Sequence, residues 1–310
     1  MTMKLHVTVA AGFGGADDGG NFPGVGRLDN ATLELNSHLR HARYYGRAAC
    51  LVAATVSRLQ MGLRSPTDLT GLVCNGGPWN LCTSWSFLSR AREAGPAYVN
   101  PLQFPATLVS ATATAGGLSV GAHAFSYVVG YDHFAFFETL LRAAQAVRFD
   151  FAQRVLTIGV STSDTAIETA SEKAGICEPL DVALGFAIDR SSVGTHFDLL
   201  GVTNEEEFLL NYPAAVRYEA VWSKEGLTFP LSIPVSGHDA MGATGAVLIL
   251  SAAMHHERLA SSARGGPEFA VSLRDDNRFM AAVFRLGNGS LFAHWITGLA
   301  IPQRERRSLR

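Results

Sequence analysis

A chain of 310 residues with a formal net charge of −2 and a hydrophobic share of 47% fits a globular protein built as one large domain or two closely packed halves. The positive residues are dispersed, apart from a basic stretch over Arg304–Arg310 that is typical of a solvated tail, so nucleic-acid binding has no support. No apolar stretch is long enough to cross a membrane, and the N-terminal residues lack the apolar core and cleavage site of a signal peptide. We therefore expect a cytoplasmic protein that binds neither nucleic acid nor a membrane.

The first part of the chain alternates predicted strands and helices. Lys4–Ala10 predicts a first strand, and Arg43–Met61 predicts a helix because its apolar residues recur on one side. Leu69–Asn75 predicts a short strand before a Gly-Gly-Pro turn. Trp79–Ala94 predicts a further helix, which ends at the breaker pair Gly95-Pro96.

The segment from residue 100 to residue 164 carries the most information. It opens with Asn100-Pro101-Leu102-Gln103-Phe104-Pro105 and continues through a run of small residues over Ser110–Gly117. The apolar run Ala124–Val129 then predicts a strand, and Gly130 marks a turn. The helical spacing of apolar residues over Asp132–Val147 predicts the next helix. A buried strand is predicted after it, at residues 155–160.

A strand that bends sharply into a helix has a specific chemical use. The free N–H groups and the positive dipole end of the helix favour an anion at the bend. A Cys placed there is held partly as thiolate and becomes a good acyl nucleophile. This chain has Gly130 at the bend, and glycine has no side chain that could hold an acyl group.

The second part of the chain repeats the order of the first. After a last first-half strand predicted at Ala183–Asp189, the second part opens with Ser232–Ser236, which leads to a turn at Gly237-His238. Ala240–Met254 then predicts a helix of small residues. Phe269–Arg274 and Phe279–Leu286 predict a hairpin over Asp275-Asp276-Asn277. The order strand, turn, helix, strand, strand therefore occurs twice, and the second occurrence is the shorter one.

The Asn-Pro-x-x-Phe-Pro opening, the Ala/Gly run and the approach Gly121-Ala122-His123-Ala124-Phe125 occur in an order that resembles the β-ketoacyl synthases of the thiolase-fold superfamily. This resemblance implies an α/β, thiolase-like layered αβαβα fold of two pseudo-equivalent halves. We expect an N-terminal ketosynthase-like half over residues 1–190 and a shortened C-terminal half over residues 191–310. Helices are expected to lie between the sheets.

The resemblance also implies the site. Active members use a Cys that takes the acyl chain and two His that assist decarboxylation and stabilise an oxyanion. The resemblance places Gly130 at the position where active members carry the Cys nucleophile. Gly237-His238 opens a candidate for the Gly-His signature, which makes His238 a catalytic candidate, although a structural histidine at a helix N-terminus explains it as well. Phe284–Gly289 resembles the loop that gates the active site, and an ordinary Asn-Gly turn explains the same residues.

The aromatic residues around the bend are candidates for a substrate tunnel or a subunit interface. Most aromatic residues at helical spacing belong to a core, but the adjacent Phe136 and Phe137 cannot both face one side of a helix. The candidates for the tunnel or interface are Phe125, Phe134, Phe137 and Phe284.

No metal or cofactor is expected. Cys50, Cys74, Cys82 and Cys177 have spacings that fit neither a zinc site nor a disulfide framework. The glycines over Gly12–Asp17 follow a predicted strand, but they lack the last glycine and the helix of a dinucleotide-binding motif.

Three functions remain open. The first is a non-catalytic ketosynthase-like subunit, similar to a chain-length factor. It would form a heterodimer with an active ketosynthase along a shared strand at residues 118–129 and would help to shape the acyl tunnel. It would work with acyl carrier protein in type II polyketide or fatty-acid-like biosynthesis, and it would have no condensing activity of its own. The second is an acyltransferase or decarboxylase that acts on acyl-carrier-protein or coenzyme A thioesters without a Cys nucleophile. The third is a homodimeric scaffold protein.

Overall fold

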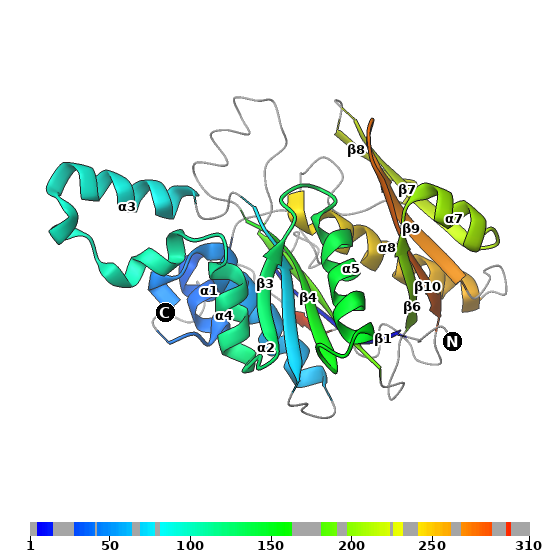
Figure 1. Ribbon diagram of the computed structural model, residues 1–310, viewed down its shortest axis with the longest axis horizontal. Helices are drawn as coiled ribbons and strands as arrows, with labels where there is room; N and C mark the ends of the chain where they lie inside the picture. The colour runs from blue at the N-terminus through cyan, green and yellow to red at the C-terminus, as the bar shows by residue number, and fades with distance from the viewer. Residues whose placement is uncertain are drawn as a thin grey trace, which may run out of the picture.

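The computed structural model describes residues 5–14, 28–40, 42–63, 69–77, 81–162, 181–190, 197–223, 226–231, 241–261, 268–286 and 296–298 (Figure 1). The strands are β1 (Leu5–Gly14), β2 (Thr70–Asn75), β3 (Phe125–Val129), β4 (Arg154–Ser161), β5 (Val182–Asp189), β6 (Phe197–Thr203), β7 (Val216–Ser223), β8 (Gly226–Thr228), β9 (Glu268–Arg274), β10 (Phe279–Leu286) and β11 (Ile296–Gly298). The α-helices are α1 (Asn30–Ser37), α2 (Arg47–Gly62), α3 (Leu81–Ala94), α4 (Ala111–Val120), α5 (Ala135–Arg148), α7 (Glu205–Asn211) and α8 (Thr244–Ser261). Short 3₁₀ turns are η1 (Ala42–Tyr44), η3 (Pro96–Tyr98), η4 (Pro101–Thr107) and η5 (Met241–Ala243).

The strands of the described residues form one sheet, and its order repeats itself. The order is β3-β2-β4-β5-β1-β6-β10-β9-β7-β8, with β11 paired to β1. Read outward from the β1–β6 junction, each half has its first, fifth, fourth, second and third strand in that sequence. Strand directions also agree, because in each half the first three strands alternate antiparallel and the fourth pairs in parallel. Only the outermost pairs differ, since β3 is parallel to β2 whereas β8 forms an antiparallel hairpin with β7.

The helices lie in three layers around these strands (Figure 1). Helices α2 and α4 pack on each other and on the first half of the sheet, and α1 packs on α2. Helices α5 and α8 pack on each other and on strands of both halves, so they form the middle layer. Helix α7 contacts β10 on the outer side of the second half. The predicted layered α/β fold with two pseudo-equivalent halves is confirmed.

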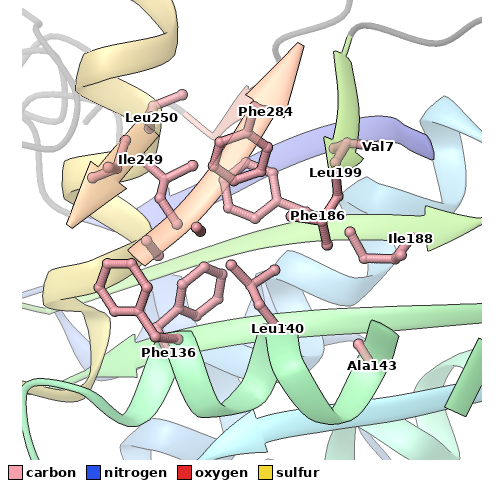
Figure 2. Packing of buried hydrophobic residues seen from close by; sticks show 14 of the residues in the cluster. Val7, Phe136, Leu140, Ala143, Phe186, Ile188, Leu199, Ile249, Leu250 and Phe284 are labelled. Carbon is pink, nitrogen blue, oxygen red and sulfur yellow. The ribbon is translucent and has the colours of Figure 1, made fainter. Parts of the chain in front are cut away.

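The buried side chains gather between these layers, as this architecture requires. Figure 2 shows the middle cluster, in which Phe136 and Leu140 of α5 point toward Phe186 of the first half and Phe284 of the second. A second cluster packs α2 against the first-half strands through residues such as Leu51 and Leu156. A third and smaller cluster lies under α7, and its fully buried members are Phe208, Ala215, Ala270, Ala281 and Val283.

A row of charged side chains crosses the seam between the halves, and we call it the charged ladder. Each member is the register partner of the next, on six adjacent strands. In order across the sheet they are Arg154, Asp189, His6, Asp198, Arg285 and Glu268. Contact distances are 3.1 Å for Arg154–Asp189, 2.8 Å for His6 Nδ1–Asp198 Oδ1 and 2.6 Å for Arg285–Glu268. Cross-strand pairs of opposite charge stabilise a sheet, and Arg154–Asp189 and Arg285–Glu268 are such pairs within the two halves. The hydrogen bond between His6 and Asp198 spans the seam between the halves.

The run of small residues requires a correction to the predicted helices and strands. The run of small residues from Ser110 begins α4, a helix that the sequence pattern did not predict. Helix α4 ends at Val120, and Gly121 follows it in the left-handed conformation (φ 62°). The expected strand over residues 118–129 is therefore wrong for residues 118–124, and β3 begins only at Phe125. Because α4 carries no polar face and no strong cap, its pattern of small residues gave no helical signal.

Candidate functional site

The bend between β3 and α5 leaves no room for a side chain at Gly130. The residue has a φ of 65°, a conformation that favours glycine. A Cβ placed there would lie 2.7 Å from both Cα and Cβ of Ala135 and 2.9 Å from Glu138 Oε2. Gly130 therefore packs directly against the first turn of α5, and only glycine fits without a shift of that turn.

The ends of several elements meet at this bend. Gly76, just after β2, donates its N–H to Val129 O at 3.2 Å and to Gly130 O at 2.9 Å. The buried side chain of Asn75 accepts from Val160 N at 2.6 Å and donates to Val160 O at 3.0 Å, which fixes β2 to the end of β4. Gly242 packs on Asn75 so closely that a Cβ there would overlap the amide nitrogen. The ends of β2, β3 and β4 thus meet the start of α8, as ligand sites do in open α/β sheets.

The N-terminus of α5 already has its counter-charges. Asp132 Oδ1 accepts from Phe134 N at 2.8 Å, and Glu138 lies in the first turn of the helix. Arg278, from the turn between β9 and β10, donates to Asp132 Oδ2 at 3.1 Å and to Glu138, and its guanidinium lies 4.7 Å from the centre of the Phe134 ring. Two carboxylates satisfy the positive end of the helix dipole, and one guanidinium from the second half holds both.

His133 completes this cluster. Its ring stacks on Trp222 of β7, with centroids 4.6 Å apart and planes inclined by 8°. Its Nε2 lies 3.4 Å from Asp275 Oδ2, a distance longer than an ordinary hydrogen bond. Burial acts to raise the pKa of Asp275, but the backbone N–H groups of Asn277 and Arg278, together with His133, lower it overall. The carboxylate of Asp275 is therefore held in its ionised form beside the imidazole.

Sequence reasoning missed this cluster because its members come from both halves. Its residues are Asp132, His133, Glu138, Trp222, Asp275 and Arg278. The sequence offered one signal, the pair Asp132-His133 immediately before the α5 pattern, where side chains commonly cap a helix. The helix itself begins at Ala135, so the residues nearest its N-terminus are His133 and Phe134 rather than Gly130.

The other predicted site residues lie in three kinds of place. Phe134, Phe137 and Phe284 are buried members of the middle cluster, away from the protein surface. Phe125 of β3 is half-buried, and its ring lies 5.2 Å from the ring of Tyr127. His238 lies outside the described residues, which resume at η5 and α8 just after it.

The cysteines whose side chains the structure describes are Cys50 and Cys74, and both are buried with free thiols. Burial raises the pKa of Cys50 to about 11 and that of Cys74 to about 12. A thiol with such a pKa is a poor nucleophile at neutral pH. Neither cysteine is therefore activated as a nucleophile.

The described part of the chain contains no group of three or more His, Cys, Asp or Glu side chains placed to hold a metal ion. None of its helices is long and apolar enough to cross a membrane.

The similarity of this chain to known proteins lies in its fold. No family model matches the sequence, and no curated protein matches it. Among solved structures, the ishigamide ketosynthase/chain length factor matches with a TM-score of 0.70 and 14% identity, over 91% of this chain and 99% of that chain. A type II polyketide synthase acyl-carrier protein in complex with its ketosynthase matches with a TM-score of 0.67 and 11% identity, over 92% and 100% of the two chains.

A third structure has a lower TM-score. It is a ketosynthase in complex with its chain length factor from Xenorhabdus doucetiae, and it matches with a TM-score of 0.52 and 10% identity, over 91% of this chain and 99% of that chain. Identities at this level carry information on the fold alone. The chain therefore has the thiolase-like, layered fold of the ketosynthases.

Proposed function

We propose that the chain is a non-catalytic ketosynthase-like subunit, similar to a chain-length factor, that pairs with an active β-ketoacyl synthase. The observation that carries this proposal is the Gly130 bend in a ketosynthase fold. The bend keeps its place between strand and helix, but a Cβ at Gly130 would lie 2.7 Å from Ala135. Without a nucleophile the chain forms no acyl thioester there, so condensation requires a partner that supplies one.

An unpaired strand edge and exposed apolar side chains near the bend support a surface for a partner. Among the described strands β3 pairs only with β2, so half of its N–H and C=O groups face away from the sheet. The preceding segment, residues 81–109, projects from the body of the protein (Figure 1), and we call it the apolar arm. The exposed apolar side chains of the apolar arm are Trp85, Leu88, Tyr98, Leu102, Phe104, Leu108 and Val109.

Leu118 of α4 and Tyr131 after β3 are exposed apolar side chains as well. Exposed apolar side chains that gather along one part of a chain are typical of a protein interface. We infer that the active ketosynthase covers the apolar arm and the free edge of β3. Phe125 and Tyr127, half-buried on β3, would then lie where the two subunits meet and would line an acyl tunnel, whereas Phe134 and Phe137 lie in the core. The ketosynthase partner would in turn receive acyl groups from acyl carrier protein.

Co-expression with a candidate ketosynthase, followed by size measurement in solution, tests the proposal. We expect a stable 1:1 heterodimer for the native chain. Leu102→Asp should abolish it, because a charge on the apolar arm would be buried without a partner. Leu210→Asp on α7 is the matched control, since it also replaces an exposed leucine but lies in the second half. The control should leave the heterodimer intact.

Other outcomes separate the alternatives. The purified chain could instead form a homodimer that Leu102→Asp dissociates, with no heterodimer in any mixture. That result would replace the proposal by the homodimeric scaffold. Turnover of acyl-carrier-protein or coenzyme A thioesters by the chain alone, abolished in His238→Ala, would replace it by an enzyme with altered chemistry.

Thiol labelling tests the absence of a nucleophile directly. At pH 7.5, about one in 10³ to 10⁴ thiols with a pKa near 11 carries a negative charge. Cys50 and Cys74 should therefore resist iodoacetamide in the folded chain. Both should be labelled rapidly in urea, and peptide mass spectrometry measures each site. Fast labelling or acylation of either cysteine in the folded chain would contradict the proposal.

A further inference from the structure

A cavity of about 330 Å³ lies at the other end of α5, away from the Gly130 bend. The last turns of α5 form one wall, and β6 and α7 form the opposite wall. The described part of β1 begins at Leu5, which pairs with Leu199, so β6 borders the cavity from Leu200 onward. The volume of the cavity falls at the lower end of the range for small-molecule sites.

The cavity has an apolar interior and a polar rim. Its apolar lining includes Leu141 and Ala144 of α5 and Leu199 and Val202 of β6. Phe149, which is 64% exposed, stands at its mouth. The polar groups that line it are Gln145, Arg148, Thr203, Glu207, Asn211 and Tyr212. A concave apolar space with a few polar groups at one side is the usual form of a site for a small amphiphilic ligand.

Arg148 is the cation that lines the cavity, and Glu207 is the anion. Within the described part of the chain the guanidinium of Arg148 has no hydrogen bond or ion pair, whereas the acids near it are engaged. Asp150 pairs with Arg190, and Glu207 Oε2 accepts from Thr203 Oγ1 at 2.7 Å. Burial raises the pKa of Tyr212, helped by Glu268 and Glu207 and opposed by Arg148, so the arginine acts on the phenol at the opposite wall. The cavity thus faces one uncommitted cation.

We propose that this cavity binds a small amphiphilic carboxylate, with the carboxylate on Arg148 and the hydrocarbon chain against Leu141, Leu199 and Val202. An unpaired guanidinium prefers a planar carboxylate, which it can bind through two hydrogen bonds. The apolar wall gains from each methylene that leaves water. This site is separate from the bend and from the apolar arm, so it stands or falls independently of the proposed function.

Calorimetric titration of the purified chain with octanoate tests the proposal, with hexanoate and decanoate as a length series. We expect saturable 1:1 binding that tightens about fourfold per methylene until the cavity is full. Octylammonium, which has the same chain and the opposite charge, should bind at least about tenfold more weakly. Absence of octanoate binding up to millimolar concentrations, or equal binding of octylammonium, would overturn the proposal.

Two variants locate the site. Arg148→Gln should weaken octanoate binding by about tenfold or more, and Ala144→Leu should abolish it by filling the cavity. Arg90→Gln, on the exposed surface of α3, is the matched control and should bind like the native chain. Because Arg148 is exposed, Arg148→Gln should keep the native melting temperature. This variant therefore tests the site even where Ala144→Leu does not fold. Unchanged affinity in folded Arg148→Gln would show that octanoate binds elsewhere and would overturn the proposal.

Discussion

The two halves of the protein share a strand order but differ in what covers it. In the first half α1, α2 and α4 cover the outer face over a large buried cluster. In the second half α7 packs over a cluster with five fully buried residues. The middle layer of α5 and α8 contacts strands of both halves. The common part of the halves is therefore the part that faces the middle layer, and the outer layers are free to diverge.

The difference is largest between the second and third strands of each half. In the first half this connection contains α3, η3, η4 and α4, and it exposes the apolar arm. In the second half it is the tight β7–β8 hairpin. Within the described residues, the long segment with many exposed apolar side chains therefore belongs to the first half. The proposed heterodimer would therefore form through the first half. The second half contributes Arg278 and Asp275, which contact the segment between the Gly130 bend and α5.

The strongest test of the shared middle layer is Phe136→Ala. Phe136 is fully buried on α5, and its ring lies 5.7 Å from the ring of Phe186. Its removal should lower the free energy of unfolding by about 4 kcal/mol, through lost burial and the cavity left behind. Hydrogen exchange should accelerate in both halves, because α5 packs on both.

Phe208→Ala is the matched comparison. Phe208 lies under α7 in the smaller outer cluster, 6.0 Å from the ring of Phe279. Phe208→Ala should lower the free energy of unfolding by less than Phe136→Ala does, because fewer buried side chains surround Phe208. Hydrogen exchange should accelerate mainly in the second half. Equal acceleration in both halves for the two variants would break the distinction between middle and outer layers.

The first-half end of the charged ladder supplies the second test. Asp189 and Arg154 have side chains that are only 4% and 8% exposed, and Asp189 also accepts from Thr8 Oγ1 at 3.2 Å. Asp189→Asn removes the negative charge beside the buried guanidinium and should cost about 3 kcal/mol in the free energy of unfolding. Denaturant titration measures the loss, and Asp189→Asn combined with Arg154→Met should recover part of it. A double variant as unstable as the sum of the two single variants would contradict this coupling.

The third test asks how tightly the bend is packed. Gly130 and Gly121 have nearly equal φ values of 65° and 62°, but the nearest atom to a Cβ at Gly121 is His123 Nε2 at 3.7 Å. Gly121→Ala should therefore cost only the backbone strain, about 1 kcal/mol. Gly130→Ala should cost about 2 to 3 kcal/mol, because its Cβ also collides with Ala135. Equal losses in thermal unfolding for the two variants would mean that the bend has room for a side chain.

The sequence predicted the framework well where patterns were local. The strands around Leu72 and Ile158 are buried apolar runs, and α5 shows helical spacing, so all were predicted within a few residues. The region from Phe197 to Ser223 was not predicted, because β6 is mostly half-buried and has no clean alternation. Its place in the fold depends on pairing with β1 and β10, which no local pattern encodes.

The candidate site was predictable only in part. Gly130 was found because a glycine after an apolar run is a strong turn signal, and its positive φ agrees with that signal. The contacts that Arg278 and Trp222 make with the α5 N-terminus were not predictable, because these residues lie 84 or more positions further along the chain than Glu138. Such contacts depend on how the two halves pack, and that information is distributed over the whole middle layer.

The second-half end of the charged ladder gives the smallest expected effect. Glu268 and Arg285 are 26% and 41% exposed, and their ion pair measures 2.6 Å. Glu268→Gln should cost less than about 1 kcal/mol, because solvent screens an exposed pair and the ordering of two long side chains offsets its attraction. The small loss should shrink further in 1 M salt, whereas the loss in Asp189→Asn should change little, because buried charges are screened less. Chemical unfolding of both variants at two salt concentrations measures this contrast. A salt-independent loss of several kcal/mol in Glu268→Gln would show that the second half holds its end of the ladder as rigidly as the first.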